Sequence, residues 1–292
     1  MNLLVTGGSG FIGKNLIEHL SKKHSLLAPR HGELELLDEN AVRSFFKKNV
    51  VDVVIHSAVK PGHRNAKDPS NQLYSNTRMF FNILRNAGYY KKMIFIGSGA
   101  VYDMRAYQPK MKEDFFDTSV PADEHGFSKY LIAKHIEGSN NCVELRVFGI
   151  FGKYEDYTIR FISNAICKTL FDLPITIRQN RRFDYLYIDD LMSVVDHFIG
   201  VPGKYPAYNI TPDASIDLYS VAEKIRARSG KDVEIVVAEP GLGIEYSGDN
   251  ARLRAEIPEL NFTPLDQAID CLYDWYQSNV HLLDRNKLLI DK

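Results

Sequence analysis

The stretch Met1-Asn-Leu-Leu-Val-Thr-Gly7-Gly-Ser-Gly10-Phe-Ile-Gly13 runs from an apolar strand directly into a turn with regularly spaced glycines, and residues 14–22 continue as a helix. A strand, a Gly-x-x-Gly-x-x-Gly turn and a helix, in this order, are the parts of a dinucleotide site. The turn must fold tightly, and its backbone must approach a pyrophosphate closely. The helix then directs its first N–H groups and the positive end of its dipole at the phosphates. We expect the following residues to bind a dinucleotide: Gly7, Ser9, Gly10, Phe11, Ile12 and Gly13.

Length and composition exclude several other classes of protein. The chain has 292 residues, enough for one large domain or two smaller ones, and a net charge of −1, which argues against a nucleic-acid partner. No apolar run approaches the roughly 20 residues that span a bilayer. The first apolar stretch breaks at Gly7, so we expect no signal peptide. The three cysteines lack CxxC spacing, so we expect no metal site and a reducing, cytoplasmic location.

Strand and helix signals alternate through the first half of the chain, which is typical of a parallel sheet covered on both faces by helices. Beyond the first unit, strands are expected at residues 25–28, 33–38, 51–56, 92–97, 142–146, 174–178, 185–188 and 207–210. Helices are expected at residues 40–48, 71–86, 126–137, 159–170, 189–199, 215–229 and 265–277.

The fold class that follows is α/β, with a Rossmann-type doubly wound parallel sheet and a smaller α/β substrate-binding lid domain. After Gly152 the alternation becomes less regular. We expect residues 1–152 together with about 183–211 to form the dinucleotide-binding domain. Residues from about 153 to 182 together with 212–292 then form the substrate-binding domain. This second domain closes over the carboxyl ends of the parallel strands, where ligands bind in such folds.

Seven short blocks follow one another along nearly the whole chain, and together they resemble a known family. The blocks are Thr6-Gly7-x-x-Gly10-x-x-Gly13, Val54-Ile-His56-Ser-Ala58, Asn76, Gly97-Ser98-Gly-Ala-Val-Tyr102, Gly126-Phe-Ser128-Lys129, Leu145-Arg146-Val-Phe148 and Tyr185-Leu-Tyr-Ile-Asp189-Asp190. They are similar to those of the extended short-chain dehydrogenase/reductases that process nucleotide sugars. The stretch 33–42 is most similar to the branch that contains GDP-fucose synthases and other 4-keto-sugar reductases. The resemblance implies a nucleotide-sugar substrate and a homodimer built around the helices at 71–86 and 126–137.

The family uses a serine or threonine, a tyrosine and a lysine. As the resemblance implies, the hydroxyl group orients the sugar oxygen and the tyrosine transfers a proton. The lysine lowers the pKa of the tyrosine and holds the nicotinamide ribose. An acid is needed because hydride transfer to a carbonyl carbon leaves an alkoxide. Ser98 follows a strand and precedes Tyr102 by four residues, as the family's serine does.

Two registers compete for the tyrosine and lysine positions. Tyr130-Leu-Ile-Ala-Lys134 contains the Tyr-x-x-x-Lys pattern, whereas His125-Gly-Phe-Ser-Lys129 has the surrounding family pattern with histidine in place of tyrosine. We favour His125 and Lys129, because a helix that begins near Gly126 acquires an apolar face. Histidine has an unperturbed pKa of about 6.5, which suits proton exchange near neutrality, and a nearby lysine would lower it. A tyrosine or water as the donor, or loss of the chemistry, stay open as alternatives.

The cofactor prediction depends on the end of the second strand. It reads Ala28-Pro-Arg30-His31 and lacks the acidic residue that holds the ribose 2′-hydroxyl of NAD. Arg30 is placed to bind a 2′-phosphate. We therefore expect NADP, with NAD as the alternative. By resemblance, Leu36 lies against the adenine, while Ala58 and Lys60 lie along the phosphates and ribose.

Substrate residues are expected in two places. The loop 60–64 leaves a strand end beside the expected nicotinamide, so His63 is a candidate for sugar contact. The family's arginine that grips the diphosphate is displaced here to Arg181 or Arg182, of which Arg182 is our first candidate. Glu239-Pro-Gly241 stands where the family often has Arg-Pro-Gly, which leaves the nucleotide open.

These expectations combine into a leading function, which is NADP-dependent reduction of a 4-keto nucleotide-diphosphate sugar in the synthesis of deoxysugars for surface polysaccharide. The alternatives are an NAD-dependent nucleotide-sugar 4-epimerase and a catalytically silent dinucleotide-binding protein. A dehydratase is disfavoured, because Gly99-Ala100 offers no carboxylic acid after Ser98.

Overall fold

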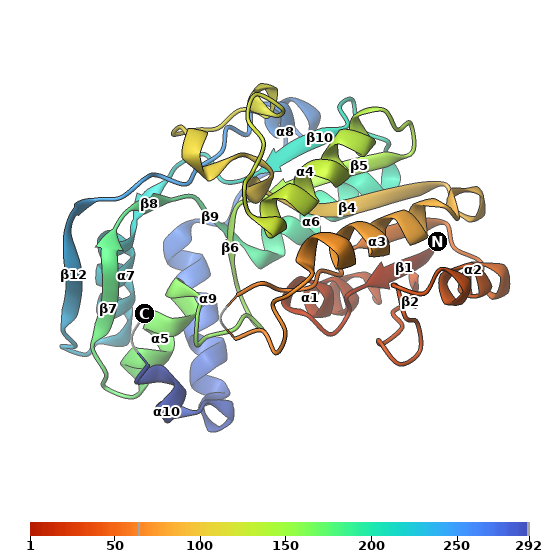
Figure 1. Cartoon of the computed structure of the whole chain (residues 1–292). Helices are drawn as coiled ribbons and strands as arrows, with labels where there is room; N and C mark the ends of the chain where they lie inside the picture. Colours follow the sequence, from red (N-terminus) through yellow and green to blue (C-terminus); the bar gives the residue numbers. More distant parts are fainter. Residues whose placement is uncertain (64, 291–292) are drawn as a thin grey trace.

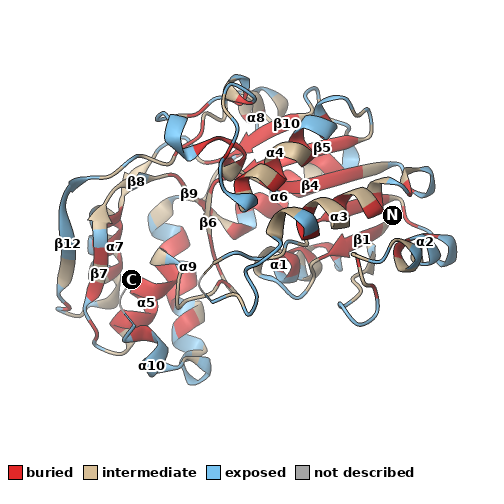
Figure 2. Cartoon of the chain, in the orientation of Figure 1, coloured by how far each residue is buried: buried red, intermediate tan, exposed pale blue. Residues whose placement is uncertain are grey.

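A six-stranded parallel sheet forms the centre of the structure, a computed structural model in which residues 1–63 and 65–290 are described (Figure 1). The strand order is β10-β5-β4-β3-β1-β2. The chain adds β2 on one side of β1 and the later strands on the other side, which makes the sheet doubly wound. The strands are β1 (Asn2–Thr6), β2 (Ser25–Leu27), β3 (Val53–His56), β4 (Lys92–Ser98), β5 (Cys142–Val147) and β10 (Ala207–Ile210). Figure 2 shows that the centre of this sheet is buried. The expected α/β class is confirmed.

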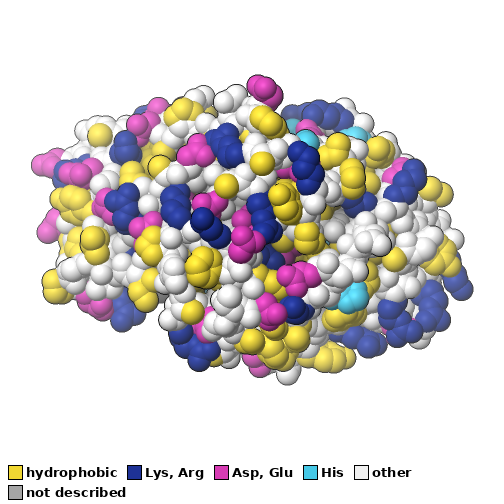
Figure 3. Space-filling model, turned by 90° about the horizontal axis from the view of Figure 1, so that it is seen from above, with side chains coloured by type: hydrophobic (Ala, Val, Ile, Leu, Met, Phe, Trp, Pro, Cys, Tyr) yellow, Lys and Arg dark blue, Asp and Glu magenta, His cyan; other side chains and the backbone are white. Residues whose placement is uncertain are grey.

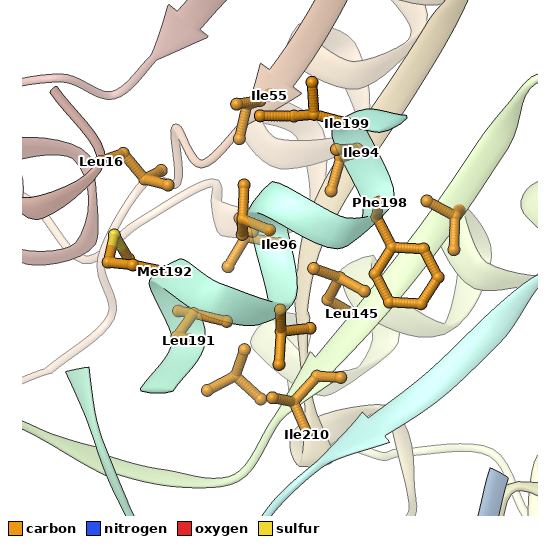
Figure 4. Packing of buried hydrophobic residues seen from close by; sticks show 14 of the residues in the cluster. Leu16, Ile55, Ile94, Ile96, Leu145, Leu191, Met192, Phe198, Ile199 and Ile210 are labelled. Atoms are coloured by element: carbon orange, nitrogen blue, oxygen red, sulfur yellow. The ribbon is translucent and has the colours of Figure 1, made fainter. Parts of the chain in front are cut away.

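Helices cover both faces of the sheet because the strands carry apolar side chains on both sides. On one face α1 (Phe11–Leu20) and α6 (Ile188–Gly200) pack through Leu16 and Met192 against Ile55 and Ile96, as Figure 4 shows. On the other face lie α2 (Glu39–Lys48), α3 (Gln72–Leu84) and α4 (Glu124–Glu137). The packing on these two faces forms the first hydrophobic core of the molecule.

A second hydrophobic cluster lies beyond the carboxyl ends of these strands. It is built by α5 (Phe161–Leu170), α7 (Leu218–Ser229) and α9 (Leu265–Ser278) against the parallel pair β7 (Ile175–Asn180) and β12 (Ile235–Leu242). The connecting pairs are β6 (Gly149–Phe151) with β9 (Tyr185–Tyr187), and β8 (Arg182–Phe183) with β11 (Ile216–Asp217). The shorter helices are α8 (Ala251–Glu256), α10 (Arg285–Leu288), η1 (Ala87–Tyr89), η2 (Gly99–Val101), η3 (Met104–Ala106), η4 (Glu113–Phe115) and η5 (Val280–Leu282). This arrangement agrees with the expected lid, while the domain boundaries themselves stay a prediction.

One sequence-based expectation about an element was wrong, and the strand β12 was missed. Residues 33–38 form turns instead of a strand, because Leu34 and Leu36 bury their side chains under α2 and α3 without a strand partner. Asp38 then begins α2 by accepting the N–H groups of Asn40 and Ala41. The strand β12 was missed because its outer half is exposed and contains Pro240 and Gly241, which indicate a turn.

A buried ion pair lies between the sheet and α4. Arg146 on β5 donates from Nε to Glu144 at 2.8 Å and from Nη1 to the Tyr102 hydroxyl at 3.0 Å. The arginine and glutamate side chains are 2% and 0% exposed. Tyr102 in turn donates to Asn209 at 2.8 Å. These hydrogen bonds pair most of the polar groups that are buried here, and no sequence pattern indicated them.

The surface carries both signs of charge. Figure 3 shows lysine and arginine side chains interspersed with aspartate and glutamate over the face seen from above, in keeping with the net charge of −1. Within residues 1–63 and 65–290, no helix has the combination of length and apolar character that crossing a membrane requires.

Candidate active site

Two adjoining cavities lie along the carboxyl ends of the central strands. The larger has a volume of about 690 Å³ and extends to the second cluster, while the smaller, of about 470 Å³, lies beside β2 and α3. Both are lined by Gly7, Gly10, Ser57 and Val59. The glycine turn therefore lies where the two cavities meet, which is the place expected for the middle of a dinucleotide.

The glycine turn is shaped so that side chains are excluded from it. Gly7 has φ +72°, and a Cβ there would lie 2.7 Å from the Ala58 nitrogen. A Cβ on Gly13 would lie 2.1 Å from the Gly7 carbonyl oxygen. The N-cap of α1, Gly10, has no side chain to bind the first N–H groups of the helix. These groups are thus left for a pyrophosphate, and the turn fits a dinucleotide.

The smaller cavity contains most of the residues expected to hold the adenosine half. Arg30, Leu36, Ala58, Lys60 and Ser9 line it, whereas Phe11, Ile12 and Gly13 line the larger cavity. Binding of a cofactor by these residues stays a prediction.

Two further contacts fix the wall of the smaller cavity. The Lys60 N–H donates to Asn76 at 2.7 Å, and its ammonium group binds Asp68 at 2.6 Å. Glu35 also lines this cavity, but it accepts the Leu37 N–H at 2.8 Å and pairs with His31 at 3.0 Å. The only acid of the described lining is therefore already engaged.

Ser98, His125 and Lys129 line the larger cavity together. Ser98 comes from the end of β4, and the other two come from the first turns of α4, four residues apart on one helix face. Asp123 begins this helix by accepting the Gly126 N–H at 2.8 Å. A Cβ on Gly126 would lie 2.8 Å from the Ala100 carbonyl oxygen, so glycine allows α4 to approach the turn after Ser98.

The competing tyrosine and lysine lie elsewhere. Tyr130 donates its hydroxyl to Asp117, and Lys134 binds Asp117 at 2.9 Å and Glu137 at 3.0 Å. Neither Tyr130 nor Lys134 belongs to the described lining of the two cavities. The structure thus brings His125 and Lys129, and not the later pair, beside Ser98.

Lys129 is a buried cation. Its ammonium group donates to the Ile96 carbonyl at 3.3 Å and lies 4.6 Å from the centre of the Phe95 ring. Burial lowers the pKa of Lys129 to about 8, against the opposing effect of Glu144. This lysine therefore titrates close to neutral pH.

His125 is neutral at pH 7. Burial, and after it the charge of Lys129, lowers the pKa of His125 to about 4. Its Nδ1 is buried and has no hydrogen-bond partner within the described part of the chain. A neutral imidazole carries one N–H donor and one acceptor, so it can donate to an oxygen without first being protonated.

The distal end of the larger cavity is basic. Arg160, Arg178 and Arg181 line it, together with Gln179 and Tyr185. Arg178 also pairs with Glu239 at 2.9 Å, which is the acid that stands where the family often has arginine. Glu155 is the one acid in the described lining of this cavity, so three arginines outnumber it and favour a ligand with several negative charges.

Two expected substrate residues lie outside the described cavity lining. Arg182 turns to Ser215, binding its carbonyl at 2.6 Å and its hydroxyl at 3.1 Å, because alternate residues of a strand point to opposite sides. Arg181, the alternative to Arg182, lines the larger cavity, and contact with a diphosphate stays a prediction. His63 lies on the loop that binds Asp156 and Thr158 through Asn65. Arg64 of that loop lies outside the described residues.

The acidic pair at the start of α6 serves the scaffold. Asp190 accepts the N–H and the hydroxyl of Thr263 at 3.1 and 2.7 Å. It thus ties α6 to the C-terminal part, while both carboxylates lie in the first turn of the helix, where negative charge is favourable. Across the described residues, no group of three or more histidine, cysteine or acidic side chains is arranged to hold a metal ion.

Several cavity residues were missed by the sequence analysis, among them Arg160, Arg178 and Tyr246. Tyr246 follows β12 and lines the larger cavity beside Ser98. Nothing in the local sequence marks this tyrosine, because it lies almost 150 residues from the serine it meets, in a segment with no strong periodicity.

Comparison with known proteins agrees with this geometry. The model of the NAD dependent epimerase/dehydratase family matches residues 3–211. The chain is 26% identical over 310 residues to GDP-L-fucose synthase 1 from Arabidopsis thaliana, covering 95% of this chain and 94% of the relative. It is 26% identical over 311 residues to dTDP-4-dehydro-6-deoxyglucose reductase from Escherichia coli, covering 92% and 96%.

Among solved structures, the fold is similar to that of MlghC, a GDP-mannoheptose C4 reductase from Campylobacter jejuni with NADP bound. The TM-score is 0.82 at 22% identity, with 94% of this chain and 98% of that chain covered. At this identity the likeness shows the shared fold.

Proposed function

The chain belongs to the NAD dependent epimerase/dehydratase family, and within it we propose that the protein reduces the C4 carbonyl of a 4-keto nucleotide-diphosphate sugar with NADPH. The observation that carries this proposal is the meeting of Ser98, His125 and Lys129 on the wall of a cavity that continues into the glycine turn. The matched relatives named as a fucose synthase and a 4-dehydro-sugar reductase support a reduction. Deoxysugar synthesis for surface polysaccharide is the role that we propose for the product.

The nicotinamide, when bound, supplies a hydride to the sugar carbon. Ser98 and His125 then bind the carbonyl oxygen, each through one hydrogen-bond donor. Because the buried His125 is neutral, it stabilises the developing oxyanion as a neutral donor, as an imidazole of lowered pKa can do. Lys129 holds positive charge beside this oxygen and binds the ribose. The alkoxide that hydride transfer leaves takes the His125 N–H proton as the imidazole accepts one from the Lys129 ammonium group on its other nitrogen, and Lys129 then regains a proton from solvent.

The basic end of the larger cavity suits the diphosphate of the substrate. Arg178 lies on β7, Arg181 directly follows this strand and Arg160 precedes α5, so all three approach from the second cluster. Arg160 also lowers the pKa of His125 electrostatically. We propose that the nucleotide diphosphate binds these arginines, with the sugar between them and His125.

A preference for NADPH over NADH is expected from Arg30. Arg30→Ala should weaken NADPH binding by about 1.5–3 kcal/mol, because it removes a charged donor to the 2′-phosphate, and should leave NADH binding nearly unchanged. Titration of protein fluorescence with each cofactor measures both. Arg43→Ala is the matched control, since Arg43 is an exposed arginine paired with Glu39 on α2. Equal affinity of the unaltered protein for NADPH and NADH would contradict the prediction.

The reduction rate should depend on the charge of Lys129. Its protonated form is the active one, and its pKa is lowered to about 8. Activity at saturating substrate is therefore expected to be level between about pH 6 and 7 and to fall as the pH rises through about 8. Lys134→Ala should leave this profile unchanged, because Lys134 binds Asp117 outside the cavity. A rate that stays level to pH 10 would contradict the assignment.

Incubation with NADPH and a panel of GDP-, UDP- and dTDP-linked 4-keto sugars tests the proposed function. NADPH absorbance should fall with at least one of them, and the product mass should rise by two hydrogens. A 4-epimerase would instead change the sugar without net consumption of cofactor, and a silent protein would bind NADPH without turnover. The homodimer through α3 and α4 stays a prediction.

A further inference from the structure

Tyr246 reaches the catalytic serine from the C-terminal part of the chain. Its N–H donates to the Arg182 carbonyl at 2.9 Å, and its carbonyl accepts the Asp184 N–H at 3.4 Å. Two residues later, the Gly248 N–H donates to the Asp184 carboxylate at 2.7 Å. The backbone on both sides of Tyr246 is thus fixed by the segment that connects β8 to β9.

The Tyr246 ring lies in an aromatic group. It stacks on Tyr107 with ring centres 5.1 Å apart and packs against Phe148 at 5.2 Å. Its hydroxyl lies close enough to Ser98 and Tyr107 for both to counteract in part the raised pKa of Tyr246, and Ser98 and Tyr246 line the same cavity. A Cβ on Gly99 would lie 2.5 Å from this hydroxyl, so the glycine after Ser98 leaves the room that the tyrosine occupies.

The tyrosine hydroxyls stay protonated in this environment. Burial, and after it the Asp184 carboxylate, raises the pKa of Tyr246 above its ordinary value. Burial also raises the pKa of Tyr107, with Tyr246 and Asp184 acting in the same direction. Each hydroxyl therefore keeps a hydrogen to donate across the range of pH in which the protein functions.

The hydrogen-bond capacity of Ser98 determines where its own hydrogen points. A serine oxygen accepts two hydrogen bonds and donates one. Ser98 Oγ already accepts the Ala100 N–H at 3.2 Å. One acceptor site of Ser98 Oγ therefore remains, and a bond from the Tyr246 hydroxyl to it would leave the serine hydrogen for an oxygen inside the cavity.

We propose that Tyr246 is the positioning residue of Ser98, and that its hydroxyl donates to Ser98 Oγ and so directs the serine hydrogen at the carbonyl oxygen of the substrate. This proposal rests on the proposed function. Tyr107 fixes the neighbouring backbone, because its hydroxyl donates to the Gly99 carbonyl at 3.5 Å. A residue that follows β12 thereby completes a site whose other members lie at the end of β4 and on α4.

The kinetic test is a double-mutant cycle on Ser98 and Tyr246. Tyr246→Phe removes one oxygen and keeps the ring, and kcat should fall between about 10- and 100-fold, as when a catalytic group is misplaced and not removed. KM should change little. In Ser98→Ala, the further change Tyr246→Phe should cost no more than about twofold, because residues that act as a unit are not additive. Tyr130→Phe is the control, since its hydroxyl binds Asp117.

A second measurement detects the contact between Tyr246 and Ser98 without any catalytic turnover. In ligand-free protein labelled with [ζ-¹³C]tyrosine, the resonance that disappears in Tyr246→Phe should shift in Ser98→Ala and stay in place in Tyr130→Phe. An unshifted resonance, or independent effects of the two substitutions on kcat, would overturn the proposal. A protein that shows the shift but reduces no keto sugar would instead contradict the proposed function, so the two failures are distinguishable.

Discussion

Replacing His125 with phenylalanine is expected to lower the rate of keto-sugar reduction by about 10²–10⁴-fold, the contribution of a positioned proton donor. Phenylalanine preserves the volume of the ring but has no N–H to place on the carbonyl oxygen. NADPH binding should stay nearly intact, because the glycine turn and Lys129 do not depend on the imidazole. Steady-state rates together with cofactor titration separate the two effects.

The control for this substitution is Tyr130→Phe. The Tyr130 hydroxyl binds Asp117 and is not part of the described lining of either cavity, so its loss should leave the rate within about twofold of the unaltered protein. If Tyr130→Phe abolished activity while His125→Phe preserved it, the assignment of His125 and Lys129 would be wrong by five residues.

Arg146→Leu is expected to destabilise the protein by about 3–5 kcal/mol, because it leaves the Glu144 carboxylate buried and without its partner. Glu144 is 0% exposed, and one of its oxygens, Oε1, has no hydrogen-bond partner among the described residues. Urea unfolding followed by circular dichroism measures the change.

The surface provides the comparison for this prediction. Lys134→Ala breaks exposed ion pairs with Asp117 and Glu137, and should cost no more than about 1 kcal/mol. If Arg146→Leu cost as little as Lys134→Ala, the buried pair would contribute nothing to the stability of the native state.

Sequence patterns predicted those parts of the fold and the site that depend on residues close together in the chain. The glycine turn was predictable because its spacing, the preceding strand and the following helix lie within 20 residues, and each glycine answers a backbone requirement. The placement of His125 and Lys129 was predictable for the same reason, since residues four positions apart on a helix lie on the same face. Ser98 followed from its position at the end of a strand.

The failures concern contacts between distant segments. Leu34 and Leu36 alternate like a strand but are buried in turns, because helices cover them from another part of the chain. Whether Arg181 or Arg182 faces the cavity depends on the orientation of a strand pair, and a shift of one residue reverses it. Tyr246 and the pair of Arg146 with Glu144 depend on tertiary packing that no local pattern encodes.

The most direct test of the central claim is the fate of the hydride. The protein would be incubated with 4-deuterated NADPH, labelled on either face of the nicotinamide in separate samples, and a 4-keto nucleotide sugar. The account predicts that one label appears on C4 of the sugar, with one NADP⁺ formed for each sugar reduced, and that His125→Phe slows this transfer. A sugar that changes configuration at C4 without acquiring deuterium, while NADPH stays constant, would contradict it.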